Sequence, residues 1–273
     1  MEILSALNEF CDYSKFIRGY TKHTTDRYQQ SVRLYCKVMK IWSFKKVTED
    51  NLRDFFYLGR TKRNWTASTF VTKHKSMVVF FRWCVEKKYL EFNPALEIEV
   101  PKIENKLPAK LTKQEALYLL EYVFNYPYHY RFLRYRNHAI FSTFIFAGLR
   151  KNELLSLGFG DVDLENRTLF VRLGKGNKDR ILPISSKLAE SLEKYVKERF
   201  RLRKTCPQFF VSLNRDMGFT EDGLKHLVNK IKKESKIKFG VHKLRHTFAT
   251  LMLEGGCDIY SLSRMMGHSD IKT

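Results

Sequence analysis

The 273-residue sequence predicts a mainly α-helical protein with one small β-sheet, divided into two domains. Three observations support this fold class. Apolar residues recur at helical spacing through most of both halves of the chain. One stretch around residue 175 changes to the alternation that is typical of strands, and a polar, proline-bracketed segment separates the halves. With 44% hydrophobic residues, the chain is long enough for one large or two smaller domains.

Residues 1–100 are expected to form an all-helical domain. Apolar residues near helical spacing predict one helix from Thr24 to Met39 and a longer one from Ser68 to Tyr89. Between them, Thr48 can cap a third helix with its hydroxyl group. Asn93-Pro94 then ends the helical region, because the residue before a proline disfavours the helical conformation.

Residues 101–110 form a polar linker without periodicity, and residues 111–273 are expected to form the second domain. The pattern Thr112-x-x-Glu115 is a capping box, so a helix begins directly after the linker. Between Arg167 and Ile184, two β-rich runs flank a glycine-rich polar centre, which predicts a β-hairpin. Helical sequence resumes after the hairpin. The second half is therefore predicted to be mainly helical with one small sheet.

The charge of the chain indicates a polyanionic partner. Fifty Lys and Arg residues stand against 29 Asp and Glu residues, which gives a formal net charge of +21. Folding does not require such an excess, and self-repulsion makes it mildly unfavourable. The net charge is +7 over residues 1–100 and +14 over residues 101–273, so the excess covers both domains. This distribution favours a surface that surrounds nucleic acid, and a merely lysine-rich protein is the alternative.

The sequence also predicts the compartment. Five scattered cysteines form no C-x-x-C pair, which fits buried thiols in a reducing environment better than a disulfide framework. No secretory signal opens the sequence, and its most apolar stretch, Ala139–Leu149, is shorter than the roughly 20 residues that span a bilayer. We therefore expect a soluble, cytoplasmic protein without a membrane segment.

Three local segments carry candidate functional residues. Arg150 and Glu153 are three residues apart and can share one face of a helix. Lys175 lies between two glycines at the predicted hairpin tip, where the backbone can turn sharply. His242 and Arg245 are again three residues apart. Taken singly, these residues could be an ordinary ion pair, a solvated turn lysine and a helix cap.

Together, the segments supply the groups that phosphoryl transfer requires. Two guanidinium groups can clamp a phosphate and stay charged at any working pH. They can thus supply the positive charge that Mg²⁺ supplies to the phosphate in many nucleases. Lysine and histidine side chains can move the protons of the nucleophile and the leaving group. Cys257 with His242, His246 and His268 lacks the paired spacing of zinc ligands, so neither a metal nor another cofactor is expected.

These segments resemble, in order and spacing, the catalytic motifs of tyrosine recombinases, with the phage-integrase and Xer branch most similar. The resemblance covers essentially the whole chain, and residues 1–100 resemble the family's helical core-binding domain. It implies an α+β catalytic domain over residues 111–273. The segments that carry it are Ala147–Arg150 with Glu153–Leu155, Gly174–Lys178, His242–His246 and Leu262–His268.

The resemblance implies a role for each matching residue. Arg150 and Arg245 would grip the scissile phosphate, and Lys175 would protonate the departing 5′ oxygen. The other implied roles are proton transfer from the nucleophile for His242, a hydrogen bond to the phosphate for His268, and bracing of the site for Glu153.

The implied function is site-specific recombination of DNA. The family cleaves and rejoins strands through a 3′-phosphotyrosyl intermediate without metal or other cofactor. The implied partners are a double-stranded DNA target site and, for the full-length protein, three further copies in a homo-tetramer on DNA. Candidate DNA contacts are Lys73 and Lys75 in the first domain and Arg201 and Arg203 in the second, with solvated helix faces as the alternative for each.

The family's nucleophilic tyrosine follows the motif that contains His268, and this sequence stops at Thr273. We expect a truncation before that tyrosine, so that the 273-residue form binds DNA without cleaving it. The alternatives are a natural protein without the tyrosine and a tyrosine donated by a partner chain. Tyr195 and Tyr260 have no motif support as nucleophiles.

Two other functions remain open on the sequence. One is a non-catalytic DNA-binding protein that keeps the recombinase fold and only occupies its sites. The other is a type IB topoisomerase, which uses the same residue types, although the overall spacing argues against it. Site-independent relaxation of supercoiled DNA would distinguish the second from a recombinase.

Overall fold

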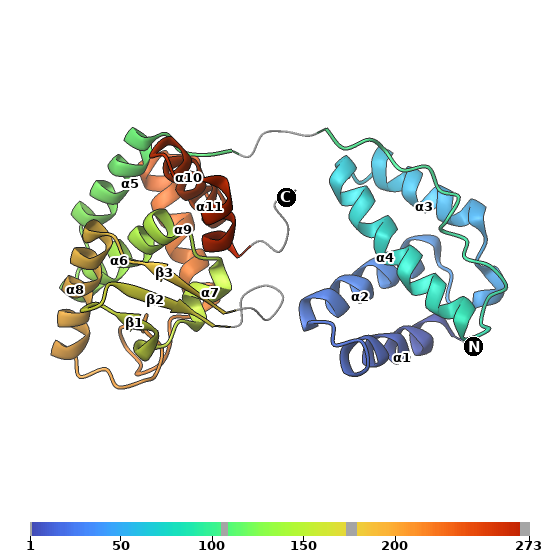
Figure 1. The fold of residues 1–273 in the computed structure, drawn as a ribbon. Coiled ribbons are helices and arrows are strands. Elements are labelled where there is room, and N and C mark those ends of the chain that lie inside the picture. The colour runs from blue at the N-terminus through green and yellow to red at the C-terminus, as the bar shows by residue number, and fades with distance from the viewer. Residues whose placement is uncertain (1, 105–108, 173–178, 268–273) are drawn as a thin grey trace. The chain divides into compact units, whose positions relative to one another are not determined.

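The structure is a computed structural model that describes residues 2–104, 109–172 and 179–267. The chain divides into two compact units, Met1–Lys106 and Leu107–Thr273 (Figure 1). Each unit has its own hydrophobic core. Both units are mainly helical, and the second contains a small sheet, so the predicted fold class is confirmed. Within the described ranges, every helix is too short or too polar to cross a membrane.

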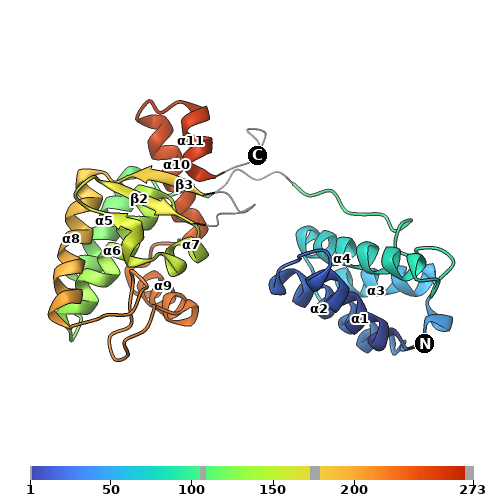
Figure 2. The same cartoon turned by 60° about the horizontal axis from the view of Figure 1, so that its bottom comes forward.

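The first unit is built from helices (Figures 1 and 2). These helices pack around aromatic side chains. In its core, the ring of Phe10 contacts the rings of Phe80 and Trp83. This all-helical composition is what the sequence predicts. Its described helices are α1 (Ile3–Phe16), α2 (Lys22–Met39), the 3₁₀ helix η1 (Phe44–Lys46), α3 (Glu49–Thr61) and α4 (Ala67–Glu86).

The predicted helix ends in this unit differ by a few residues from those observed. Helix α2 begins earlier than Thr24, because the hydroxyl group of Thr21 accepts a hydrogen bond from the Thr24 backbone N–H. Helix α4 ends before Tyr89, because Lys88 has a φ of 61°, which the right-handed helix cannot include. The predicted cap by Thr48 is confirmed at the start of α3.

Helix α6 lies at the centre of the second unit. Eleven of its residues are buried, and it packs against α5, α8 and α10. The predicted capping box of Thr112 and Glu115 is confirmed at the start of α5. The described helices are α5 (Lys113–Asn125), α6 (Arg131–Ala147), α7 (Lys151–Ser156), η2 (Phe159–Asp161), α8 (Ser186–Arg201), α9 (Glu221–Ser235), α10 (Val241–Glu254) and α11 (Ile259–Met266).

The described sheet has three antiparallel strands in the order β1-β2-β3, namely β1 (Val162–Asp163), β2 (Thr168–Val171) and β3 (Arg180–Pro183). The predicted hairpin is confirmed as β2 and β3, whereas β1 is too short to show strand alternation in the sequence. Leu169 pairs with Leu182, and both side chains are buried. Because side chains alternate along a strand, Arg180 lies on the same inward face as Leu182.

Candidate active site

A buried carboxylate, that of Glu153, organises the candidate site. Helix α6 ends at Gly148, whose φ of 61° turns the chain, and Arg150 then caps α7 with an extended backbone. The Arg150 backbone N–H donates to Glu153 Oε2 at 2.8 Å, and Arg150 Nη1 donates to Glu153 Oε1 at 2.7 Å. The expectation that both residues share a helical face is therefore corrected: Arg150 precedes the helix, and the pair meets through the cap.

Two further arginines surround the same carboxylate. Arg180, the first residue of β3, donates from Nη1 and Nη2 to the two oxygens of Glu153 at 3.0 and 2.8 Å. Arg245, on α10, places Nη1 at 3.8 Å from Glu153 Oε2. The side chains of Glu153, Arg180 and Arg245 are 6%, 9% and 7% exposed, whereas that of Arg150 is 22% exposed. We call Arg150, Arg180 and Arg245 the arginine cluster.

The arginine cluster also holds the end of α11. Arg180 Nε donates to the Met265 carbonyl at 2.7 Å, and Arg150 Nη2 donates to the Gly267 carbonyl at 2.9 Å. Arg245 Nη2 donates to the carbonyl between them, that of Met266. The last carbonyls of a helix lack partners within the helix and carry partial negative charge. Three elements thus place one guanidinium group each on three successive carbonyls.

The electrostatics of the cluster favour an anionic ligand. Burial by itself would raise the pKa of Glu153, but the hydrogen bonds from Arg180 and Arg150 outweigh it and lower that pKa to about 2. Burial, followed by the charge of Arg150, lowers the pKa of Arg245 to about 10. Glu153 and Arg245 are therefore ionised at neutral pH. Three guanidinium groups against one carboxylate leave a net positive site, and its most exposed member is Arg150.

The histidines lie near the N-terminal end of α10. His242 is exposed and lies one turn before Arg245, which points into the cluster. His246 is also exposed at its surface. Partial desolvation of its ring, followed by the charges of His242 and Arg245, lowers its pKa. Lys175 and His268, the other two candidate catalytic residues, lie outside the described residues.

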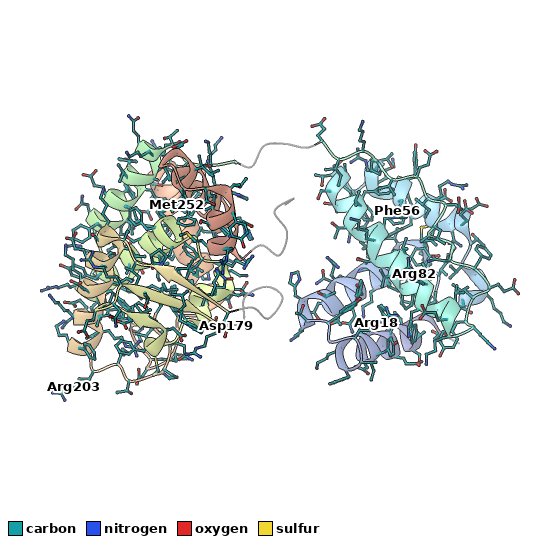
Figure 3. The ribbon with its side chains drawn as sticks, in the orientation of Figure 1. Arg18, Phe56, Arg82, Asp179, Arg203 and Met252 are labelled. Atoms are coloured by element: carbon teal, nitrogen blue, oxygen red, sulfur yellow. The ribbon has the colours of Figure 1, made fainter. Side chains whose placement is uncertain are left out.

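The candidate DNA contacts are spread over both units and lie outside the arginine cluster. Lys73 and Lys75 are on α4 of the first unit; Lys75 is exposed, whereas Lys73 Nζ lies 5.2 Å from the centre of the Trp65 ring. Arg201 ends α8 and forms an ion pair with Glu198 at 2.9 Å. Arg203 is exposed. It lies on the opposite side of the second unit from Asp179, the residue directly before Arg180 of the arginine cluster (Figure 3).

Arg180 is the site residue that sequence reasoning missed. The sequence places it among the polar residues of the hairpin centre, next to Asp179. A signal was present, because the alternation of β3 puts Arg180 on the same face as the buried Leu182, with the exposed Ile181 between them. A charged residue at an inward strand position needs a buried partner, and here that partner is Glu153.

The two tyrosines considered at the sequence level differ in environment. Tyr195 is fully buried in α8; its hydroxyl donates to the Phe209 carbonyl at 2.8 Å and accepts from the Val211 N–H at 3.0 Å. Tyr260 lies at the start of α11 and is 57% exposed. Across the described ranges, no three His, Cys, Asp or Glu side chains group in a way that could hold a metal ion.

Comparisons with known protein families cover most of the chain. Residues 110–273 match the phage integrase family, and residues 6–91 match the N-terminal SAM-like domain of phage integrases. The phage integrase match covers most of the second unit, which carries the arginine cluster. The SAM-like match covers most of the first unit.

Individual relatives match over nearly the full chain. Tyrosine recombinase XerD of Oceanobacillus iheyensis is 29% identical over 98% of this chain and 91% of its own length. Tyrosine recombinase XerC of Bacillus licheniformis is 30% identical over 98% of this chain and 89% of its own length. The solved structure of XerH site-specific recombinase bound to a palindromic difH substrate is 21% identical, covers 97% of this chain and 78% of that chain, and has a TM-score of 0.75.

Proposed function

Because the chain belongs to the phage integrase family, with tyrosine recombinases among its full-length relatives, we propose that it is a site-specific recombinase that cleaves and rejoins DNA strands. One observation supports this most strongly. Arg150, the N-cap residue of α7, and Arg245, on α10, converge on one carboxylate and one helix end. In the proposed reaction, these two guanidinium groups hold the scissile phosphate.

The arrangement is suited to stabilising a phosphoryl-transfer transition state. Negative charge develops on the non-bridging oxygens, and donors fixed in advance stabilise it without reorganisation. Glu153 and the α11 carbonyls fix the arginines, and the partial exposure of Arg150 leaves part of it open to a ligand. Guanidinium groups supply here the charge that Mg²⁺ supplies elsewhere, so the proposed reaction requires no cofactor.

The proton-transfer roles rest on the sequence motifs. We propose that His242 handles the proton of the nucleophile, that Lys175 protonates the departing 5′ oxygen, and that His268 donates a hydrogen bond to the phosphate. His242 is exposed on the helix that carries Arg245, which is compatible with access to DNA. The proposed nucleophile is a tyrosine. Tyr195 is unsuitable, because its hydroxyl is buried and already both donates and accepts a hydrogen bond.

The proposed substrate is a double-stranded DNA site, and the proposed active assembly of the full-length protein is a homo-tetramer on that DNA. The net charge of +21, distributed over both units, supports DNA binding. Lys75 and Arg203 are exposed and suited to phosphate contacts. Arg201 and Lys73 are weaker candidates, because Glu198 neutralises the first and the Trp65 ring partly covers the second.

A nicked suicide substrate, which traps the covalent protein–DNA complex, tests the proposal. The protein expressed from its full reading frame should form this complex, and Arg150→Ala should slow its formation by about 100- to 1,000-fold, the usual effect of removing one transition-state donor. DNA affinity should fall by less than about 10-fold. The matched control is Arg53→Ala, since Arg53 forms an ion pair with Asp50 of its own helix at 3.1 Å.

The same experiment separates the rival functions. Tight binding to a specific site without any covalent product would identify a non-catalytic DNA-binding protein. Relaxation of supercoiled plasmid irrespective of its sequence would identify a topoisomerase.

A further inference from the structure

Arg180 joins three parts of the site through contacts that occupy its guanidinium group. Nη1 and Nη2 bind the two oxygens of Glu153, and Nε binds the Met265 carbonyl. The side chain is 9% exposed. A guanidinium group so buried, with all three nitrogens bonded to protein acceptors, is poorly placed to grip a substrate, so its contribution must come through its neighbours.

The first neighbour is Glu153, whose carboxylate has all its acceptor positions filled. Ionised carboxylates offer about four lone-pair sites. Arg150 fills two of them through its backbone N–H and Nη1, and Arg180 fills the other two. Arg245 Nη1 lies 3.8 Å from this carboxylate, outside hydrogen-bond range, and donates instead to the Gly148 carbonyl at 2.6 Å. Without Arg180, the freed oxygens could draw in N–H groups of Arg245 or Arg150 that a phosphate would otherwise receive.

The second neighbour is the end of α11. Arg180 holds the Met265 carbonyl directly before the two carbonyls that Arg245 and Arg150 hold. The backbone at Gly267 has a φ of 63°, and an added Cβ there would lie 3.0 Å from Arg180 Nη1. This close approach indicates that Arg180 helps to fix the position of the end of α11 relative to the arginine cluster.

We propose that Arg180 is a positioning residue for strand cleavage. It occupies two of the four acceptor positions of the Glu153 carboxylate and binds the Met265 carbonyl. In this way it fixes where Arg150 and Arg245 present their remaining N–H groups. This inference rests on the proposed function, because it assumes that Arg150 and Arg245 bind the scissile phosphate. It adds a third arginine to the site, one that acts without touching the DNA.

The first test is Arg180→Lys, which keeps the charge and loses the planar, two-pronged contact. In the full-length protein, the rate of covalent-complex formation at saturating DNA should fall by about 100-fold, the scale on which a misplacement of 1 Å acts. The dissociation constant for DNA should change by less than about threefold. The matched control is Arg172→Lys on the same hairpin, where a 65%-exposed arginine pairs with Asp161 and the rate should not change.

A pH profile adds a measurement that a purely structural role would not alter. Hydrogen bonds from Arg180 are the foremost cause that keeps the pKa of Glu153 low against its burial. In Arg180→Lys that pKa rises, so Glu153 begins to gain a proton at a higher pH. The acid limb of the cleavage rate should therefore move to higher pH in Arg180→Lys and stay in place in Arg172→Lys.

A double variant covers the case in which Arg180→Lys fails to fold. Arg180→Gln combined with Glu153→Gln removes one buried positive and one buried negative charge together, which is far less costly than removing only one of the two. It should fold, bind DNA and cleave about 100-fold more slowly than wild type. Wild-type cleavage by either variant overturns the inference, and so does loss of folding in both, which would assign Arg180 to stability alone. Failure of the full-length wild-type protein to form any covalent complex would instead overturn the proposed function.

Discussion

Glu153 shows how one side chain can determine the geometry of a cationic site. Three like-charged guanidinium groups would repel one another if they were left alone in a buried place. The carboxylate between them offsets this repulsion, and its hydrogen bonds fix the directions of Arg150 and Arg180. At the residue scale, the site is therefore a balance of charges, and changing the central one should alter both stability and its dependence on pH.

Glu153→Gln should destabilise the protein by about 3 kcal/mol at pH 7. The pKa of Glu153 is about 2 in the folded state against an ordinary value of 4.5, so its contribution is fully present above pH 4.5 and is lost as the pH falls toward 2. The difference in unfolding free energy between wild type and variant should therefore narrow from pH 7 to pH 3. Urea denaturation at pH 7, 4 and 3 measures it, with the exposed Glu193→Gln as control. A difference that stays constant with pH would contradict the prediction.

Tyr195→Phe separates a structural tyrosine from a reactive one. The hydroxyl group satisfies the Phe209 carbonyl and the Val211 N–H, both in the core, so its loss should cost about 2 kcal/mol of stability. The rate of covalent-complex formation per folded molecule should not change. Denaturant unfolding and the suicide-substrate assay measure the two quantities, and Tyr130→Phe, at a 60%-exposed position, is the control. Loss of the covalent complex in a folded Tyr195→Phe protein would show that Tyr195 is reactive.

At the scale of elements, the junction between α6 and α7 links the core to the arginine cluster. Gly148 ends α6 in the left-handed conformation, and its carbonyl accepts a hydrogen bond from Arg245 Nη1 at 2.6 Å. A Cβ at this position would lie 2.2 Å from a carbon of the Phe248 ring on α10. The glycine therefore lets two helices meet and lets the turn serve as a ligand of Arg245.

Gly148→Ala should lower the unfolding free energy by about 3 kcal/mol, since it adds left-handed backbone strain to an overlap with a packed ring. It should also slow cleavage, because the Gly148 carbonyl would move relative to Arg245. Gly160→Ala is the control: an added Cβ there meets no atom within 4 Å, and stability should change by less than about 0.5 kcal/mol. Equal stability of the two variants, measured by urea denaturation, would contradict this account of the junction.

At the scale of the whole molecule, basic charge is the property that both units share. The net charges of +7 over residues 1–100 and +14 over residues 101–273 predict that each unit contributes phosphate contacts. Each such contact releases counterions, so that DNA affinity falls steeply with salt.

Lys75→Ala should reduce the slope of log affinity against log salt by about 1 without changing which site is preferred, because a phosphate contact carries no sequence information. Binding titrations between roughly 50 and 200 mM salt measure the slope. Lys194→Ala is the control, since Lys194 pairs with Glu190 of its own helix at 2.6 Å. An unchanged slope for Lys75→Ala would remove Lys75 from the proposed interface.

Local interactions explain what could be predicted from the sequence alone. Interactions between residues close in sequence determine the caps of α3 and α5 and the β2-β3 hairpin. They also determine the helical class of the first hundred residues, so the sequence is sufficient to predict all three features. The sequence also singled out Arg150, Glu153 and Arg245, because each belongs to a short segment with a recognisable motif.

Only the tertiary structure decided what these residues contact. Arg180 joined the site because strand alternation turned it inward toward Glu153, which is 27 residues away in the sequence. Three successive α11 carbonyls became ligands of arginines from β3, α7 and α10. Local patterns contain no information on such partners, because the pairing depends on how helices and strands pack around α6. The sequence determined which charges are present, and the packing determined which of them meet.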